Sequence, residues 1–169
     1  DKNDIPKNTE EFRREVSGVT AGEDETLYDM VVCGGGIAGT CMALAAVREG
    51  INVCFIQDRP VLGGCNSSEI KVGLGGQVRS EPYPNLGNVL QDISPVFGSP
   101  GSFDGHFYED ERKANAFYTA KVWANGRYTL SLNERVIALE KNGDKISSVT
   151  TKNIYTGKIK KYKGRLFAD

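Results

Sequence analysis

One glycine-rich segment has the residue spacing of a nucleotide-binding turn. Gly34-Gly35-Gly36-Ile37-Ala38-Gly39 matches the pattern G-x-G-x-x-G. In such a turn the first glycine permits a tight bend, the second lets a diphosphate approach the backbone, and the third lets a helix pack closely on a strand. Backbone N–H groups at the start of that helix then bind the phosphates. The residues expected at the phosphates are Gly34, Gly36, Ile37, Ala38 and Gly39.

The segments around this turn have the order of a βαβ unit. Residues 27–33 form an apolar, β-branched run, residues 37–48 have apolar side chains at helical density, and residues 52–57 form a second apolar run. Strands that are apolar throughout are typical of a parallel sheet covered on both faces. A glycine run outside such a unit is often only a turn, but a position between strand and helix favours dinucleotide binding.

The end of the second predicted strand is where this fingerprint places an acidic side chain for the ribose hydroxyls. Gln57 occupies that position, and Asp58 and Arg59 follow it. A glutamine amide can hydrogen-bond a ribose diol without charge assistance, and Asp58 would serve if the strand ends one residue later. Arg59 leaves open the recognition of a 2′-phosphate, and therefore the binding of NADP. The alternative for these side chains is a solvent-exposed turn.

Composition argues against several other kinds of protein. The 169 residues include 21 basic and 22 acidic side chains, so no broad electrostatic attraction to nucleic acid or to an anionic membrane is expected. No apolar stretch approaches the roughly 20 residues that span a bilayer, and we expect a soluble domain of the cytoplasm or periplasm. No metal site is expected, because the chain has one histidine and its four cysteines lack the paired spacing of a zinc site.

The rest of the chain predicts a polar leader, one irregular stretch, one long helix and several strands. We expect the leader over residues 1–26 and irregular structure over 59–105, with a short helix near 88–93. A helix is predicted over 110–125, with one side formed by Ala114, Phe117, Tyr118, Lys121 and Val122. The predicted strands cover residues 128–132, 136–140, 146–154, 158–162 and 165–168.

Three stretches resemble a known family. Residues 28–39, 57–64 and 66–70 are similar to FAD-dependent oxidoreductases of the glutathione-reductase-like superfamily, which has two dinucleotide-binding domains. The motif Arg59-Pro60-Val61-Leu62-Gly63-Gly64, followed by an Asn/Ser-rich segment ending in Ser-Ser-Glu, resembles a subgroup often provisionally named as xanthan lyases, a name that does not establish an activity. The resemblance implies FAD and a Rossmann-like, doubly wound α/β domain over residues 27–169, with an antiparallel three-stranded meander.

The resemblance also assigns positions to the cofactor. It places Gly63 and Gly64 against the flavin side, with Cys65 and Ser67 in the same segment, and it implies that the backbone of Val136 holds the adenine. In the family, the last predicted strand leads into a further glycine-acid motif. We therefore expect the N-terminal part of a longer enzyme, whose site is completed by the rest of the polypeptide or by an oligomer partner. The expected substrate is a small molecule, with neither nucleic acid nor membrane as partner.

No catalytic residue is assigned, because a flavin carries its own redox chemistry. His106 has no visible partner, and Cys65 has no second cysteine to form a dithiol. Glu69 and Lys71 face either their own segment or a substrate. Three aromatic residues either line a pocket or anchor a loop: Phe103, Phe107 and Tyr108. Two other functions stay open, a truncated nucleotide-binding module without catalysis and an NADP-linked dehydrogenase.

Overall fold

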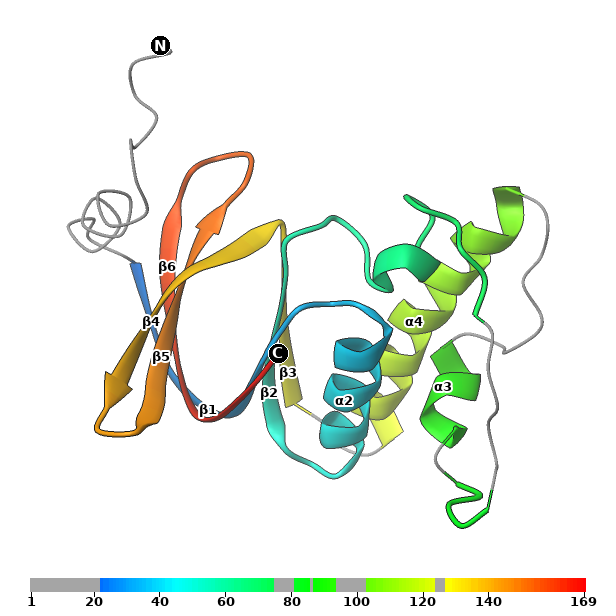
Figure 1. Ribbon diagram of the computed structural model, residues 1–169, viewed down its shortest axis with the longest axis horizontal. Coiled ribbons are helices and arrows are strands. Elements are labelled where there is room, and N and C mark those ends of the chain that lie inside the picture. The colour runs from blue at the N-terminus through cyan, green and yellow to red at the C-terminus, as the bar shows by residue number, and fades with distance from the viewer. Residues whose placement is uncertain (1–21, 75–80, 86, 94–102, 124–126) are drawn as a thin grey trace.

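A six-stranded mixed sheet with helices on one side forms the core of the protein (Figure 1). The computed structural model describes residues 22–74, 81–85, 87–93, 103–123 and 127–169. The elements in chain order are β1 (Gly22–Cys33), α2 (Ile37–Arg48), β2 (Asn52–Gln57), the 3₁₀ helix η1 (Gly64–Asn66), α3 (Asn88–Ile93), α4 (Phe103–Trp123), β3 (Arg127–Leu132), β4 (Glu134–Asn142), β5 (Lys145–Asn153) and β6 (Ile159–Ala168).

The strands β3, β2, β1 and β6 lie side by side in this order and pair in parallel. Along β2, Val53 and Phe55 face the helices, whereas Cys54 and Ile56 face the opposite side, and all four are buried. The βαβ unit and the prediction of strands covered on both faces are therefore confirmed. The short predicted helix near residues 88–93 is also confirmed, as α3.

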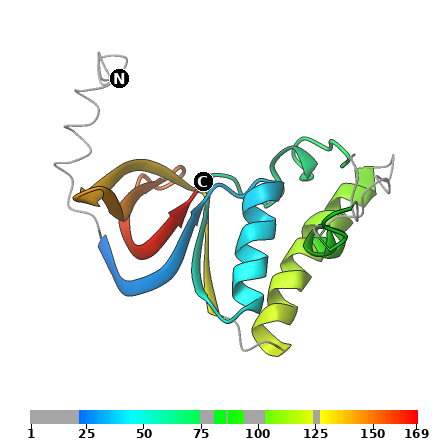
Figure 2. The ribbon, with the colours of Figure 1, turned by 60° about the horizontal axis from the view of Figure 1, so that its bottom comes forward.

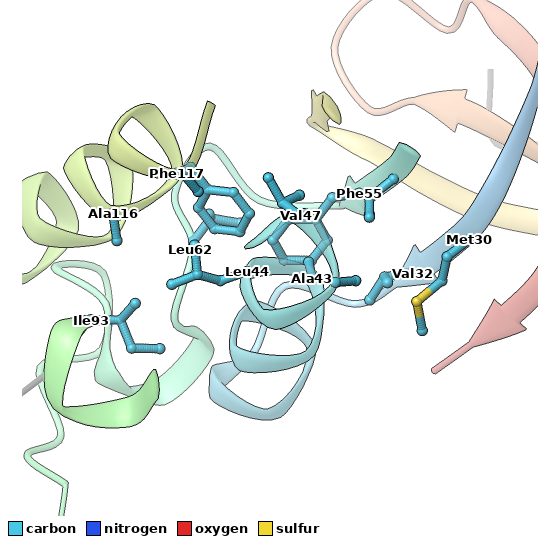
Figure 3. Packing of buried hydrophobic residues seen from close by; sticks show 13 residues of the cluster. Met30, Val32, Ala43, Leu44, Val47, Phe55, Leu62, Ile93, Ala116 and Phe117 are labelled. Carbon is cyan, nitrogen blue, oxygen red and sulfur yellow. The ribbon is translucent and has the colours of Figure 1, made fainter. Parts of the chain in front are cut away.

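Helices α2 and α4 lie next to each other and share one hydrophobic core with the sheet (Figure 2). Phe117 of α4 stacks on Phe55 of β2, with ring centroids 5.7 Å apart, and is tilted against Tyr128 of β3 at 5.2 Å. Figure 3 shows side chains from α4, α2 and β2 converging on this cluster. These contacts fix the helical layer on the parallel strands.

The other face of the parallel strands is covered by the antiparallel part of the sheet. Strands β4, β5 and β6 form an antiparallel meander, and Val149 and Tyr162 from it pack against Val31 and Ile56. The Tyr162 hydroxyl lies 2.9 Å from the Ser131 hydroxyl on β3, which satisfies a buried polar group. The Rossmann-like α/β fold with an antiparallel meander is thus confirmed.

Two strand predictions were wrong in their bounds. Strand β1 begins at Gly22, which pairs with Lys160, so the last residues of the predicted polar leader belong to the sheet. The two predicted strands over 158–162 and 165–168 are one continuous strand, β6, which pairs with β1 along its length and with β5 along its first half. Gly164 lies within it, because a Cβ there would stand 2.6 Å from Cγ2 of Val31.

Helix α4 also differs from its prediction. It begins at Phe103, seven residues before the predicted start, so His106 lies on a helix and not in an irregular loop. The predicted buried side was wrong as well, since Tyr118 and Val122 are exposed. The buried side instead consists of Lys113, Ala116, Phe117 and Ala120. None of the helices that the structure describes is both long and apolar enough to cross a membrane.

Candidate functional site

The glycine turn lies where β1 ends and α2 begins, at the carboxyl ends of the parallel strands. Gly34 has φ +107°, a backbone conformation that a side chain would strain. A Cβ on Gly39 would lie 2.0 Å from the carbonyl oxygen of Gly34, so only glycine allows this helix to start so close to the strand. In open α/β sheets, ligands bind beyond the carboxyl ends of the strands. The turn is therefore placed as the fingerprint predicts.

Gly36 presents an open backbone surface at the start of α2. A Cβ on Gly36 would find no atom within 4 Å, and the residue caps the helix without a side-chain hydrogen bond. The N–H groups at the start of a helix have no partner within the helix. Ile37, Ala38 and Gly39 carry the first of these groups, at the positive end of the helix dipole. This geometry fits an anion such as a diphosphate.

The Gln57 side chain forms hydrogen bonds that stabilise the glycine turn. Its Oε1 accepts a hydrogen bond from the Gly35 N–H at 2.9 Å, and its Nε2 donates to the Val61 carbonyl at 3.3 Å. The residue is buried. Thr40 adds a bond from its hydroxyl to the Gly35 carbonyl at 3.2 Å. Both polar atoms of the Gln57 amide are engaged within the protein, so it does not present a free amide to a ribose.

The second glycine pair lies directly against the first turn. Gly63 and Gly36 form an isolated parallel bridge, and the Gly63 N–H donates to the Gly35 carbonyl at 2.7 Å. A Cβ on Gly64 would stand 3.3 Å from the Gly36 Cα. Gly63 and Gly64 both have positive φ, at +110° and +58°. The two segments that the sequence predicts at the cofactor are thus brought together by backbone contacts that favour glycine.

Cys65 and Ser67 follow this pair in different environments. Cys65 is exposed and free. Ser67 is buried, and its hydroxyl donates to the Gly64 carbonyl at 2.7 Å and accepts from the Glu69 N–H. The Ser67 side chain therefore shapes the backbone of this segment, and a direct contact with a cofactor stays a prediction.

Asp58 follows the end of β2, and Val136 lies on the edge strand β4. Asp58 forms an ion pair with Arg135, whose Nη2 lies 3.2 Å from Asp58 Oδ2, and both side chains are partly exposed. Val136, the next residue on the edge strand β4, is 37% exposed. The Asp58 carboxylate, predicted for the ribose, is therefore paired with the residue that precedes Val136, whose backbone is predicted for the adenine.

The remaining candidates are placed as follows. Glu69 lies 4.0 Å from Arg59, so these two exposed side chains form a weak ion pair. Lys71 is exposed, with φ +62°. The side chains of four residues lie outside the described part of the chain: Phe103, His106, Phe107 and Tyr108. Among the described residues, no group of three or more metal-ligating side chains comes together.

The structure also shows two features that the sequence analysis missed. Cys33, at the end of β1, has its pKa raised to about 11, because burial disfavours the thiolate and the Asp169 carboxylate adds a negative charge. Lys113 is fully buried on α4 and lies next to Gly63. The signal for Lys113 was present in its spacing of three and four residues from Ala116 and Phe117, which form the buried side of the helix.

Solved structures that are similar to this chain include FAD-dependent proteins. The glycerol-3-phosphate dehydrogenase from Bacillus halodurans, complexed with FAD, is 12% identical with a TM-score of 0.53, and the match covers 85% of this chain and 34% of that one. THI4 from Thermovibrio ammonificans is 12% identical with a TM-score of 0.56, covering 94% and 60%. The myxobacterial chondrochloren halogenase CndH, an FAD-dependent halogenase, is 12% identical with a TM-score of 0.55, covering 83% and 36%.

At these identities the likeness concerns the fold, and the chain spans only part of each of these structures, from 34% to 60% of their length. No curated protein matches the sequence. The fold and the paired glycine turns define a dinucleotide-binding domain of the Rossmann type. Residues 29–169 match the model of the family described as FAD dependent oxidoreductase. The chain belongs to this family, and its cofactor is FAD.

Proposed function

We propose that this chain binds the ADP half and the diphosphate of FAD in an oxidoreductase that transfers a hydride between a small organic substrate and the flavin. The observation that carries the proposal is the open surface of Gly36 at the N-terminus of α2. A diphosphate at this surface accepts hydrogen bonds from the first helical N–H groups and lies at the positive end of the dipole. FAD supplies the redox chemistry when it is bound.

The family resemblance supports roles for the other residues. The resemblance places Gly63 and Gly64 on the flavin side. A side chain at these positions would meet Lys113 or the Gly36 backbone, so glycine lets this segment lie against the first turn. The backbone of Val136 faces the adenine, whose edge needs only main-chain donors and acceptors. The finer membership of the glutathione-reductase-like superfamily and of the Ser-Ser-Glu subgroup belongs to the same proposal.

We assign recognition of the ribose to Asp58 and not to Gln57. The Gln57 amide is engaged with Gly35 and Val61, whereas the Asp58 carboxylate is partly exposed. A carboxylate accepts hydrogen bonds from two hydroxyl groups with charge assistance. Asp58 keeps this capacity beside Arg135, since one carboxylate offers about four acceptor sites.

Absorbance spectroscopy and cofactor extraction on the longest native polypeptide that contains this chain test the function. We expect a flavin spectrum and release of FAD. For residues 1–169 alone we expect ADP binding in a titration and weak retention of FAD, because the family resemblance places further flavin contacts outside the chain. A colourless full polypeptide that stays colourless after incubation with FAD contradicts the proposal. Tighter binding of NADPH than of FAD favours an NADP-linked enzyme that uses Arg59.

A further inference from the structure

The end of the Lys113 side chain lies inside the protein, next to Gly63 of the pair Gly63-Gly64. Lys113 is fully buried, and it belongs to the side of α4 that packs on the core. A Cβ on Gly63 would stand 2.8 Å from Cε and 3.1 Å from Nζ of Lys113. The end of the lysine side chain therefore fills the space that a glycine at position 63 leaves free.

A negative charge on the same helix accompanies this lysine. Asp110 Oδ1 lies 3.9 Å from Lys113 Nζ. The Asp110 carboxylate also accepts hydrogen bonds from the backbone N–H and the hydroxyl of Ser68. Asp110 therefore uses some of its hydrogen-bond acceptor sites for Ser68, in the segment after η1. Burial of an ammonium group is costly unless charge or hydrogen bonding compensates it, so a purely apolar residue would be the simpler choice at this core position.

Gly63 connects Lys113 to the diphosphate surface. The side of Gly63 that lacks a Cβ faces the end of the lysine, while its N–H donates to the Gly35 carbonyl at 2.7 Å and its backbone bridges Gly36. A single residue thus separates the buried ammonium from the turn that carries the open surface. Charges interact more strongly through protein than through water, because the effective dielectric constant is lower.

We infer that Lys113 is a positioning residue whose buried positive charge favours an anionic ligand at the glycine turn. This inference rests on the proposed function, since it takes the diphosphate of the cofactor as the anion. The Lys113 charge acts through Gly63 and adds to the dipole of α2. It needs no direct contact with the ligand.

Binding of ADP and of uncharged adenosine to variants of the chain tests this inference by NMR titration. Lys113→Met keeps the length of the side chain and removes the charge. We expect the affinity for ADP to fall about tenfold and the affinity for adenosine to stay within about twofold. Lys121→Met is the matched control, because Lys121 is an exposed lysine on the same helix. We expect it to leave the affinity for ADP unchanged.

Equal losses for ADP and adenosine in the Lys113→Met variant would show a structural role and overturn the inference. Lys113→Gln serves if the Met variant fails to fold, because it is also uncharged and its amide can still donate a hydrogen bond at the buried position. An ADP affinity equal to that of the unmodified chain then overturns the inference. If the unmodified chain binds neither ADP nor FAD, the proposed function is contradicted. If it binds ADP but the Lys113 variants bind ADP equally well, only the inference about Lys113 is contradicted.

A second measurement needs no variant. In the unmodified chain, we expect the ¹³Cε resonance of Lys113 to shift on addition of ADP and to stay in place on addition of adenosine. A resonance that responds equally to both ligands, or to neither while ADP binds, contradicts an electrostatic role.

Discussion

Gln57 accepts a hydrogen bond of 2.9 Å from the Gly35 N–H, and so joins the end of β2 to the centre of the glycine turn. In the dinucleotide fingerprint this strand position carries an acidic residue that faces the ribose. Here a neutral side chain occupies it and stabilises the turn itself. Gln57 therefore shapes the turn, and recognition of the ribose is proposed for the adjacent residue, Asp58.

Substitution of Gln57 by glutamate restores the acidic residue of the fingerprint, and we expect it to destabilise the chain. The carboxylate still accepts from Gly35, but it loses the donor to the Val61 carbonyl and places a negative charge in a buried site. The free energy of unfolding should fall by about 1–3 kcal/mol. Urea denaturation measures this change. A variant as stable as the unmodified chain would show that the hydrogen bond from the Gln57 amide to the Val61 carbonyl contributes nothing to stability.

Asp58→Asn should weaken ADP binding and change the stability of the chain little. Asp58 is partly exposed, so its ion pair with Arg135 contributes at most about 1 kcal/mol to stability. Binding of ADP should weaken about three- to tenfold, because a charge-assisted hydrogen bond to the ribose is lost. Isothermal titration with ADP and thermal melting separate the two effects. Unchanged affinity would remove Asp58 from the site.

Two glycines of the same turn should respond differently to a side chain. Gly36→Val adds atoms to the open surface at an extended backbone conformation, so we expect a melting temperature within a few degrees of the original and the loss of ADP binding. Gly39→Ala places a methyl group 2.0 Å from the Gly34 carbonyl oxygen and should cost about 3 kcal/mol or more. A Gly36→Val variant that still binds ADP would contradict the assignment of the phosphate surface.

Cys65 should be the most reactive thiol among the four cysteines, and FAD should protect it. Cys65 is exposed, Cys54 is buried, and burial raises the pKa of Cys33 and Cys41. Alkylation by iodoacetamide at pH 8, followed by peptide mass spectrometry, should therefore modify Cys65 first. We expect FAD to slow this reaction more than ADP does, because Gly64 is proposed to lie on the flavin side. Equal rates with and without FAD in the full polypeptide would contradict that placement.

Stability should fall in alkaline solution partly because of Cys33. The thiol has a pKa of about 11 in the folded chain, whereas an unfolded cysteine has a pKa of about 8.5. The unfolded state therefore loses its proton first, and the contribution of this group is complete below about pH 8 and declines as the pH rises toward 11. Cys33→Ala should reduce the slope of stability against pH between pH 8 and 10. An unchanged slope would show that other groups dominate, such as Cys41, whose pKa is also raised.

The glycine spacing and the apolar runs were sufficient to predict the βαβ unit, because each of those residues is required locally by the turn or by burial on both faces. The contact between Gly63 and the first turn was not predicted, since nothing in the local sequence shows which distant backbone will lie against Gly36; the family resemblance placed Gly63 only on the flavin side. The role of Gln57 was missed because a side chain at a strand end can face either a ligand or its own turn. Only the packing of the loop around Val61 decides between them.

Errors along the chain have a similar origin. The predicted face of α4 included Lys121 but not Lys113, and the buried face lies one residue earlier along the helix. A break between two strands was predicted at residues 163–164, where the sequence has Lys163-Gly164. Gly164 instead makes room for Val31 of the neighbouring strand. Local preference was overruled by contacts between segments distant in sequence.

The unbroken course of β6 has a mechanical consequence. Its residues pair with β1 on one side, up to the glycine turn, and with β5 on the other side, inside the meander, so one strand spans both regions. A hinge between the two regions would have to bend or break this strand. The pairing of β6 with both β1 and β5 therefore ties the meander that carries β4 to the strand that precedes the glycine turn.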